Sequence, residues 1–332
     1  MTAVPTGGPA GDGVTAVLAV VRAGALTTVQ DLGRPGYAHL GVPRSGALDL
    51  PALRRANGLV GNPAGAAVLE TTLMGCAFRL PEGGLVAVTG AAAEVTVAGV
   101  PVSRDVAVNV PPGGLVEIGR ATAGVRSYVA VAGGIAVAPV LGSRSTDTLS
   151  GLGPPRLRNG DLLPLGQPGS ADPAAAGEDV AGPDVTWAAS AADRLPSPPG
   201  APVAETDAGS SGPASDFDGV IVLPVRLGPR DAWFTPEAVE TLLTTAYTIS
   251  PNSNRVGARL AGAALARAVA GELPSEGVVL GAVQVPADGQ PLIFLADHPT
   301  TGGYPVIAVV TDVTALAQAR PGSTVRFHGP QR

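Results

Sequence analysis

The first group of residues suited to ligand chemistry lies near the N-terminus, where polar side chains alternate with glycines. Glycines there let the backbone approach a small ligand closely. The planar guanidinium of Arg34 suits a carboxylate or phosphate, and Gln30 or Asp31 could hydrogen-bond an amide. A structural role is also open, because Asp31 and Ser45 could hold turns and Asp49 could cap a helix.

A second group has two arginines four residues apart, Arg255 and Arg259, next to hydrogen-bonding side chains such as that of Ser253. This pair suits an anionic ligand or a contact between domains. It is equally consistent with surface arginines paired to acidic residues. If Arg255 binds substrate, Arg255→Ala should abolish activity and leave the fold intact.

The third group combines carboxylates, amides and a histidine near the C-terminus. Gln284 and Gln290 could read both the N–H and the C=O of a cyclic amide, because each side-chain amide donates and accepts. Glu276 or Asp297 could serve as a general base or a hydrogen-bond acceptor. His298 is a further acid–base candidate, but it precedes a proline in an expected turn, so we expect a solvent-exposed bystander.

The composition excludes several kinds of chemistry. All 21 basic residues are arginine, which excludes a P-loop lysine, a Schiff base and a biotin-carrying lysine in this chain. The single cysteine, Cys76, excludes an internal disulfide, and it lies among apolar residues where cysteine usually packs. The three histidines fall in separate segments, so no metal site is predicted. No signal peptide or membrane span is predicted, and we expect a cytoplasmic protein.

The elements that must position these residues are mainly β-strands. Glycine (46) and proline (33) are frequent among 332 residues, and short β-branched runs alternate with turn signals. We predict a flexible N-terminus at 1–13, an N-terminal domain at 14–165, a linker at 166–218 and a C-terminal domain at 219–328. Between Gly166 and Asp216 there are eight acidic residues and one arginine, so this segment carries a net charge of −7 and the rest of the chain about +1, which gives −6 for the whole.

Few helices are expected, and all are short. One follows Asp49, a good N-cap, and runs through Pro51 to about Val60. A second is capped by Thr235 and covers 237–246, because proline suits the first helical position. A third is predicted at 313–319, ending before the Pro321–Gly322 pair.

Six motifs together resemble the KipA, or allophanate hydrolase subunit 2, family, also described as the biotin-dependent carboxyltransferase family. They recur in family order from about Val20 to Phe327. The motifs are Gly24–Arg34, Gly41–Asp49, Ala56–Asn62, Ser253–Leu260, Ser275–Gly277 and Thr300–Pro305. The resemblance implies two cyclophilin-like β-barrel domains, which agrees with the strand-rich pattern, and a KipI-like (allophanate hydrolase subunit 1) partner.

Members of this family include the C subunit of bacterial 5-oxoprolinase. The resemblance therefore implies that the chain and its partner activate 5-oxoproline with ATP, which the two would share, for a LamB/YcsF-like subunit to open to glutamate. Carboxyl transfer from biotin in a urea carboxylase is the enzymatic alternative, and antagonism of the KipI-like partner is the regulatory one. We expect Glu276 and Asp297 to be catalytic. The residues expected to bind substrate are Gln30, Asp31, Arg34, Ser45, Ser253, Arg255, Arg259, Gln284, Gln290, Thr300, Thr301 and Tyr304.

Overall fold

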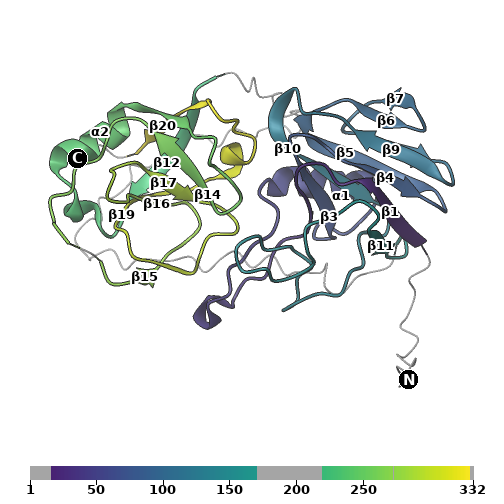
Figure 1. The fold of residues 1–332 in the computed structure, drawn as a ribbon, viewed down its shortest axis with the longest axis horizontal. Helices are drawn as coiled ribbons and strands as arrows, with labels where there is room; N and C mark the ends of the chain where they lie inside the picture. The colour runs from purple at the N-terminus through teal and green to yellow at the C-terminus, as the bar shows by residue number, and fades with distance from the viewer. Residues whose placement is uncertain (1–15, 170–218, 272, 330–332) are drawn as a thin grey trace, which may run out of the picture.

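The computed structural model describes residues 16–169, 219–271 and 273–329 (Figure 1). The predicted flexible N-terminus at 1–13 and nearly all of the predicted linker, 170–218, lie outside the described residues. The predicted limits of the two domains stay predictions. Within the described chain, the strands before and after that gap form separate sheets.

The N-terminal region consists of two antiparallel sheets that enclose one aliphatic core. Strand β9 illustrates how the sequence places the core, because Val116 and Ile118 are buried while the alternate residues Leu115 and Glu117 are half-buried. One sheet has the strand order β11 (Leu162–Leu165), β1 (Ala16–Arg22), β4 (Ala77–Leu80), β9 (Gly114–Ile118), β6 (Val95–Val97) and β7 (Val100–Val102). The other has the order β2 (Thr27–Gln30), β3 (Val68–Thr72), β10 (Ala123–Val131), β5 (Gly84–Ala92) and β8 (Ala107–Val110).

Helix α1 (Leu50–Leu59) packs on the second sheet through Leu53 and Ala56. Its N-terminus forms as predicted: the Asp49 side chain accepts a hydrogen bond from the Ala52 N–H at 3.0 Å, and proline occupies the first turn. The chain just before this helix, residues 31–49, extends toward the second domain.

The C-terminal region is a closed barrel of seven strands, in which β12 and β20 pair in parallel and close the ring. The strand order is β12 (Ile221–Leu227), β19 (Val306–Val310), β16 (Ala282–Gln284), β17 (Leu292–Phe294), β14 (Gly257–Ala261), β13 (Ala246–Ile249) and β20 (Thr324–His328). A two-stranded ribbon of β15 (Glu276–Gly277) and β18 (Thr301–Gly302) lies outside the barrel sheet. The mainly β prediction is confirmed.

Helix α2 (Pro236–Thr244) covers the barrel core through Val239 and Leu242, and its predicted Thr235 cap is confirmed. The helix predicted at 313–319 is instead a short 3-10 turn, η3 (Thr314–Ala317). Its physical reason is length, since the chain between Asp312 and Pro321 is too short to gain many α-helical hydrogen bonds. Two further 3-10 turns, η1 (Ala38–Leu40) and η2 (Asp231–Trp233), complete the described helical elements.

The two regions lie side by side, with β10 and α1 of the first facing the second (Figure 1). Leu48 belongs to the apolar core of the C-terminal barrel although it comes from the N-terminal chain. Gln318 reaches back across the seam, donating from Nε2 to Asp49 Oδ2 at 2.9 Å and accepting the Val125 and Arg126 N–H groups on Oε1. The seam therefore combines apolar packing with hydrogen bonds made by a buried side-chain amide.

Candidate functional site at the domain seam

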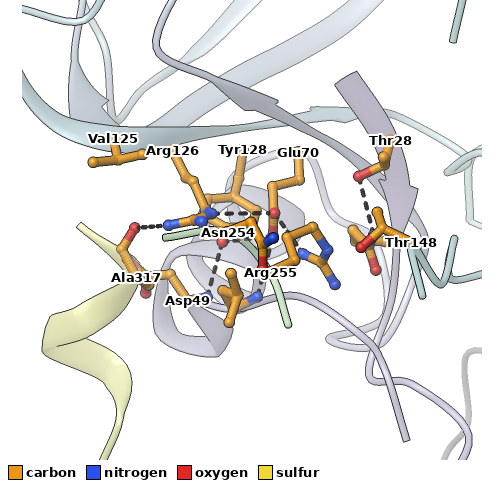
Figure 2. Close-up of polar contacts among 12 residues, drawn as sticks. Thr28, Asp49, Glu70, Val125, Arg126, Tyr128, Thr148, Asn254, Arg255 and Ala317 are labelled. Carbon is orange, nitrogen blue, oxygen red and sulfur yellow. Dashed lines mark hydrogen bonds and ion pairs between the residues drawn. The ribbon is translucent and has the colours of Figure 1, made fainter. Parts of the chain in front are cut away.

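Arg255 lies at the centre of the seam, in the loop between β13 and β14, and is 1% exposed. Its Nε and Nη2 donate to the two carboxylate oxygens of Asp297, each at 2.9 Å. Its Nη1 donates to Glu70 Oε1 at 2.5 Å (Figure 2). Its Nη2 also donates to the carbonyl of Gly46 at 2.6 Å. Burial opposes the charge, but the two carboxylates outweigh it and raise the pKa of Arg255. Each guanidinium nitrogen is thus engaged by the protein.

Glu70, on strand β3, is the N-terminal anchor of this network. Its Oε2 accepts hydrogen bonds from the Tyr128 hydroxyl at 2.8 Å and the Leu48 N–H at 3.1 Å. Arg126 lies 3.5 Å away from Oε1 and donates from Nη1 to the carbonyl of Ala317, across the seam, at 2.6 Å. Burial, with the Glu70 charge adding to it, raises the pKa of Tyr128, so this hydroxyl is a donor at neutral pH.

Asp297 is the C-terminal anchor. Besides Arg255, its carboxylate accepts from Ser45 Oγ at 2.7 Å and from the Thr148 N–H and Oγ1 at 3.0 and 2.7 Å. Burial alone would raise the pKa of Asp297, but the Arg255 charge and the Thr148 bonds hold it below its ordinary value. Both carboxylate oxygens are hydrogen-bonded within the protein. Asp297 therefore links the three segments that contain Ser45, Thr148 and Arg255.

A cavity of about 500 Å³ lies beside this network, between residues 32–50 of the N-terminal region and residues 278–314 of the barrel. Most of its wall is apolar, with Leu32, Tyr37, Val279 and Leu280 among its residues. A site at a domain interface with an apolar wall and a few polar groups is typical of small-molecule binding. The polar and charged residues of the wall are Arg34, Arg44, Ser45, His298, Thr300, Thr311, Asp312 and Thr314.

Arg34 is among the residues that line the cavity, and its buried guanidinium is bonded to the carbonyls of a neighbouring N-terminal segment. The residue is 1% exposed, its Nη2 donates to the carbonyl of Ser145, and its Nε lies 3.4 Å from the carbonyl of Val140. Its Nη1 has no hydrogen-bond partner among the described residues. Burial lowers the pKa of Arg34 against the neighbouring carboxylates, but an arginine stays charged near neutral pH. A carboxylate is the group that best satisfies such a nitrogen.

Three more buried polar atoms near Arg34 lack partners in the part of the chain that the structure describes: Gln30 Oε1, Thr146 Oγ1 and Asp147 Oδ2. Gln30 Nε2 donates to the carbonyl of Thr146 at 2.9 Å, and Ser45 Oγ contacts the same carbonyl at 3.0 Å. Buried polar groups are normally hydrogen-bonded, so a concentration of unsatisfied ones marks a functional candidate. The segment 143–150 therefore packs beside Arg34, although none of its residues is among those that line the cavity.

His298 is buried, 8% exposed, and lines the cavity. The expectation of a solvent-exposed bystander is wrong, because a turn closed by the His298 N–H and the Leu295 carbonyl folds the ring back against Phe294, 5.7 Å between ring centroids. Its Nδ1 lies 2.6 Å from the carbonyl of Pro299. Burial lowers the pKa of His298, in spite of the Pro299 carbonyl and the nearby carboxylates.

The other predicted site residues divide between the cavity and separate structural contacts. Ser45 and Thr300 line the cavity together with Arg34. Asp31 accepts hydrogen bonds from the Ser143 and Ser145 hydroxyls at 2.7 and 2.5 Å and from the Gly33 N–H at 2.7 Å. This is the turn-holding role that the sequence left open for Asp31 beside amide binding.

The amide and carboxylate groups expected to read the substrate have protein partners away from the cavity wall. Gln284 donates to the carbonyl of Tyr304 at 3.0 Å, and Gln290 bonds the backbone of Gly262 through both ends of its amide. Glu276 forms an ion pair with Arg230 at 2.8 Å. Ser253 Oγ accepts from the Arg259 N–H at 3.0 Å, the Arg259 side chain is exposed, and Thr301 pairs with Gly277.

Sequence reasoning missed Glu70, Arg126, Tyr128, Thr146 and Asp147. A signal existed for Glu70, which is the lone charged residue in the strand segment Val68–Thr72. No comparable signal existed for the 143–150 segment, whose role depends on the distant residues that pack against it.

These features define a class: a mainly β protein whose N-terminal sheets and C-terminal barrel meet at a seam with a candidate ligand cavity. The chain belongs to the family described as the carboxyltransferase domain, subdomains A and B, whose model matches residues 40–329. The predicted membership in the carboxyltransferase family is confirmed.

Several named proteins are similar to the chain. It is 37% identical over 317 residues to the C subunit of the 5-oxoprolinase of Escherichia coli (strain K12), covering 94% of this chain and 90% of that protein. It is 34% identical to the urea amidolyase of Lachancea kluyveri, of which it spans 16%.

Solved structures give the same picture. The crystal structure of TTHA0988 superposes with a TM-score of 0.72 at 32% identity, and the match covers 94% of this chain and 56% of that one. The urea amidolyase of K. lactis gives a TM-score of 0.77 at 29% identity, covering 96% and 19%. The chain thus spans little more than half of TTHA0988 and a fifth of the amidolyase.

The described residues carry neither a membrane-spanning helix nor a cluster of metal ligands. None of their helices is long and apolar enough to span a membrane. They also contain no group of three or more histidine, cysteine or acidic side chains arranged to hold a metal ion.

Proposed function

We propose that this chain is the C subunit of an ATP-dependent 5-oxoprolinase and that the seam cavity takes the cyclic amide. One observation carries the proposal: the similarity to proteins named as the C subunit of 5-oxoprolinase extends over nearly the full length of both chains, at 37% and 31% identity. The chain covers 90% and 87% of those proteins.

The geometry of the cavity supports this assignment. 5-Oxoproline has one carboxylate and one lactam, and the residues that line the cavity include two arginines, Arg34 and Arg44, together with hydroxyl and imidazole groups. A carboxylate on Arg34 would leave the ring to lie against the apolar wall. With no lysine in the chain, the phosphates of ATP would be held by arginines, by backbone N–H groups or by a partner protein.

We also propose that the activity belongs to a cytoplasmic complex with a KipI-like subunit and a LamB/YcsF-like subunit. The test is reconstitution of the three purified chains and measurement of ADP formation with and without 5-oxoproline. We expect ATP hydrolysis that depends on 5-oxoproline and on all three chains. ATP hydrolysis indifferent to 5-oxoproline contradicts the proposal.

Carboxyl transfer from carboxybiotin to urea is the second candidate. The family description and the similarity to urea amidolyases favour it. It predicts urea-dependent consumption of carboxybiotin by this chain in the presence of a biotin carboxylase, and no response to 5-oxoproline. A stable complex with the KipI-like chain that turns over neither substrate would instead favour a regulatory role.

A further inference from the structure

We propose that His298 is the general base at the seam cavity, accepting on Nε2 the N–H proton of the amide substrate while Arg34 holds the substrate's carboxylate. This inference rests on the proposed function. It assigns to His298 the general-base role for which the sequence offered Glu276, Asp297 and, as a further candidate, His298 itself.

The hydrogen bond of the ring fixes which nitrogen is the base. The Pro299 carbonyl, 2.6 Å from Nδ1, can only accept a hydrogen bond, so Nδ1 carries the proton of the neutral ring. Nε2 then bears the lone pair, and it is the ring nitrogen left for a ligand in the cavity that His298 lines. The ring is held against Phe294, so its orientation is set before substrate arrives.

The neighbouring carboxylate is unsuited to the same task. Asp297 is held by Arg255, Ser45 and Thr148, and its lowered pKa makes it a weak base. His298 is the opposite case, because burial lowers its pKa from 6.5 and keeps the ring neutral and able to accept a proton at pH 7. The charged groups around it are Asp297 and Asp147, which act on its titration, and Arg34, Arg44 and Asp312, which line the same cavity.

The proton transfer fits activation of a lactam by ATP. The lactam oxygen attacks the γ-phosphorus, forming an O–P bond, and the bond from that phosphorus to the ADP oxygen breaks, its electron pair leaving with ADP. The N–H electron pair becomes the C=N bond of the phosphorylated product, and the proton moves to His298 Nε2. Without a base the attacking amide would develop positive charge, which the apolar wall would stabilise poorly.

The kinetic test compares the wild-type complex with His298→Asn in the reconstituted 5-oxoprolinase assay. Asparagine can still donate to the Pro299 carbonyl but has no basic nitrogen. We expect kcat to fall about 10²- to 10³-fold, with KM for 5-oxoproline changed less than about threefold. The acid limb of the kcat profile, expected below pH 6.5 because the pKa is lowered, should disappear. His328→Asn, at an exposed histidine on β20, is the matched control and should behave as wild type.

A second measurement separates this inference from the proposed function. The chain has three histidines, so ¹⁵N imidazole spectra can be assigned with single His→Asn variants. We expect His298 Nε2 to be unprotonated at pH 7 and to shift when 5-oxoproline or urea is added. If the complex fails to hydrolyse ATP with 5-oxoproline while urea shifts this resonance, the proposed function fails and the base assignment stands. A kcat for His298→Asn within threefold of wild type, or no shift with either amide, overturns the assignment.

Discussion

Two regions of the seam contain the same kinds of charged and polar residue. They differ in how far these residues are already bonded within the protein. Around Arg255, every charged group meets an opposite charge or a backbone group, and the carboxylates of Glu70 and Asp297 are fully occupied. Among the residues that line the cavity, Arg34 has a buried nitrogen without a partner in the described chain and His298 keeps one ring nitrogen for a ligand. The paired charges around Arg255 hold the two domains together, whereas the second ring nitrogen of His298 is left for a ligand.

Asp297 and His298 show that the bonded network and the cavity wall are only one residue apart in the chain. They are adjacent in the chain, yet one side chain points into the network and the other lines the cavity. The network thereby sets the position of the turn that presents the histidine. Variants on the two sides of the seam should therefore affect different quantities: stability on one side, and binding or turnover on the other.

The largest effect is expected for Arg255→Ala. Removing this guanidinium leaves Glu70 and Asp297 buried without their shared cation, so the free energy of unfolding should fall by about 3–5 kcal/mol. Urea denaturation measures this, with Arg259→Ala, an exposed arginine four residues on, as the control at within about 0.5 kcal/mol of wild type. If Arg255→Ala unfolds like wild type but no longer binds 5-oxoproline, Arg255 is a substrate-binding residue and does not stabilise the seam.

A smaller loss is expected for Glu70→Gln, which keeps the shape of the side chain but removes its charge. Hydrogen bonds to charged groups contribute about 1.5–3 kcal/mol, so stability should decrease by roughly that amount. In the double variant with Arg255→Ala the two effects should be far from additive, because both residues belong to one network. Additive effects in this thermodynamic cycle would mean that the two groups do not act together. Glu117→Gln, on the half-buried face of β9, is the control.

At the cavity, Arg34→Ala should lower the affinity for the substrate. Losing a charge-assisted bond of about 1.5–3 kcal/mol corresponds to an increase in KM for 5-oxoproline of about 10- to 100-fold. Pyrrolidin-2-one, which has the lactam but no carboxylate, should be used equally poorly by wild type and variant. A KM for 5-oxoproline that does not change places the carboxylate elsewhere, and Arg44→Ala tests the other arginine of the wall.

The smallest effect is expected for glycine substitutions in the loop between β2 and α1. Gly33 has φ of +83°, and a Cβ there would lie 2.6 Å from the carbonyl oxygen of Arg44. Gly41 in the same loop has φ of +75° but open space around it. Gly33→Ala should therefore cost about 1–2 kcal/mol more than Gly41→Ala in urea denaturation. Equal costs would show that the close backbone approach beside Ser45 is not required.

Local features could be predicted from the sequence because their causes are local. Asp49 and Pro51 define the start of α1 through a side-chain cap and a missing N–H, and alternation defines strands such as β9. The pairing of Arg255 with Glu70 could not be predicted, since Glu70 is 185 residues away and only the packing of the two regions brings them together. His298 was misassigned for the same reason, because its burial depends on Phe294 and on the seam.

The candidate site was partly predictable. Glycine-flanked Arg34 and Ser45, and Thr300 in the Thr300–Pro305 motif, do reach one cavity. Gln290 and Glu276 instead satisfy a turn and an ion pair, because residue type and strand-edge position do not say which partner a polar group finds first.

A crystal structure of the chain with bound 5-oxoproline would show which side of the seam takes the ligand. We expect density in the seam cavity, with the carboxylate about 2.7–2.9 Å from Arg34 Nη1 and the lactam N–H on His298 Nε2, and with Arg255 still bonded to Glu70 and Asp297. Density for 5-oxoproline elsewhere on the chain, or on an Arg255 released from Glu70, would contradict this account, in which Arg255 stabilises the seam and the cavity binds the ligand.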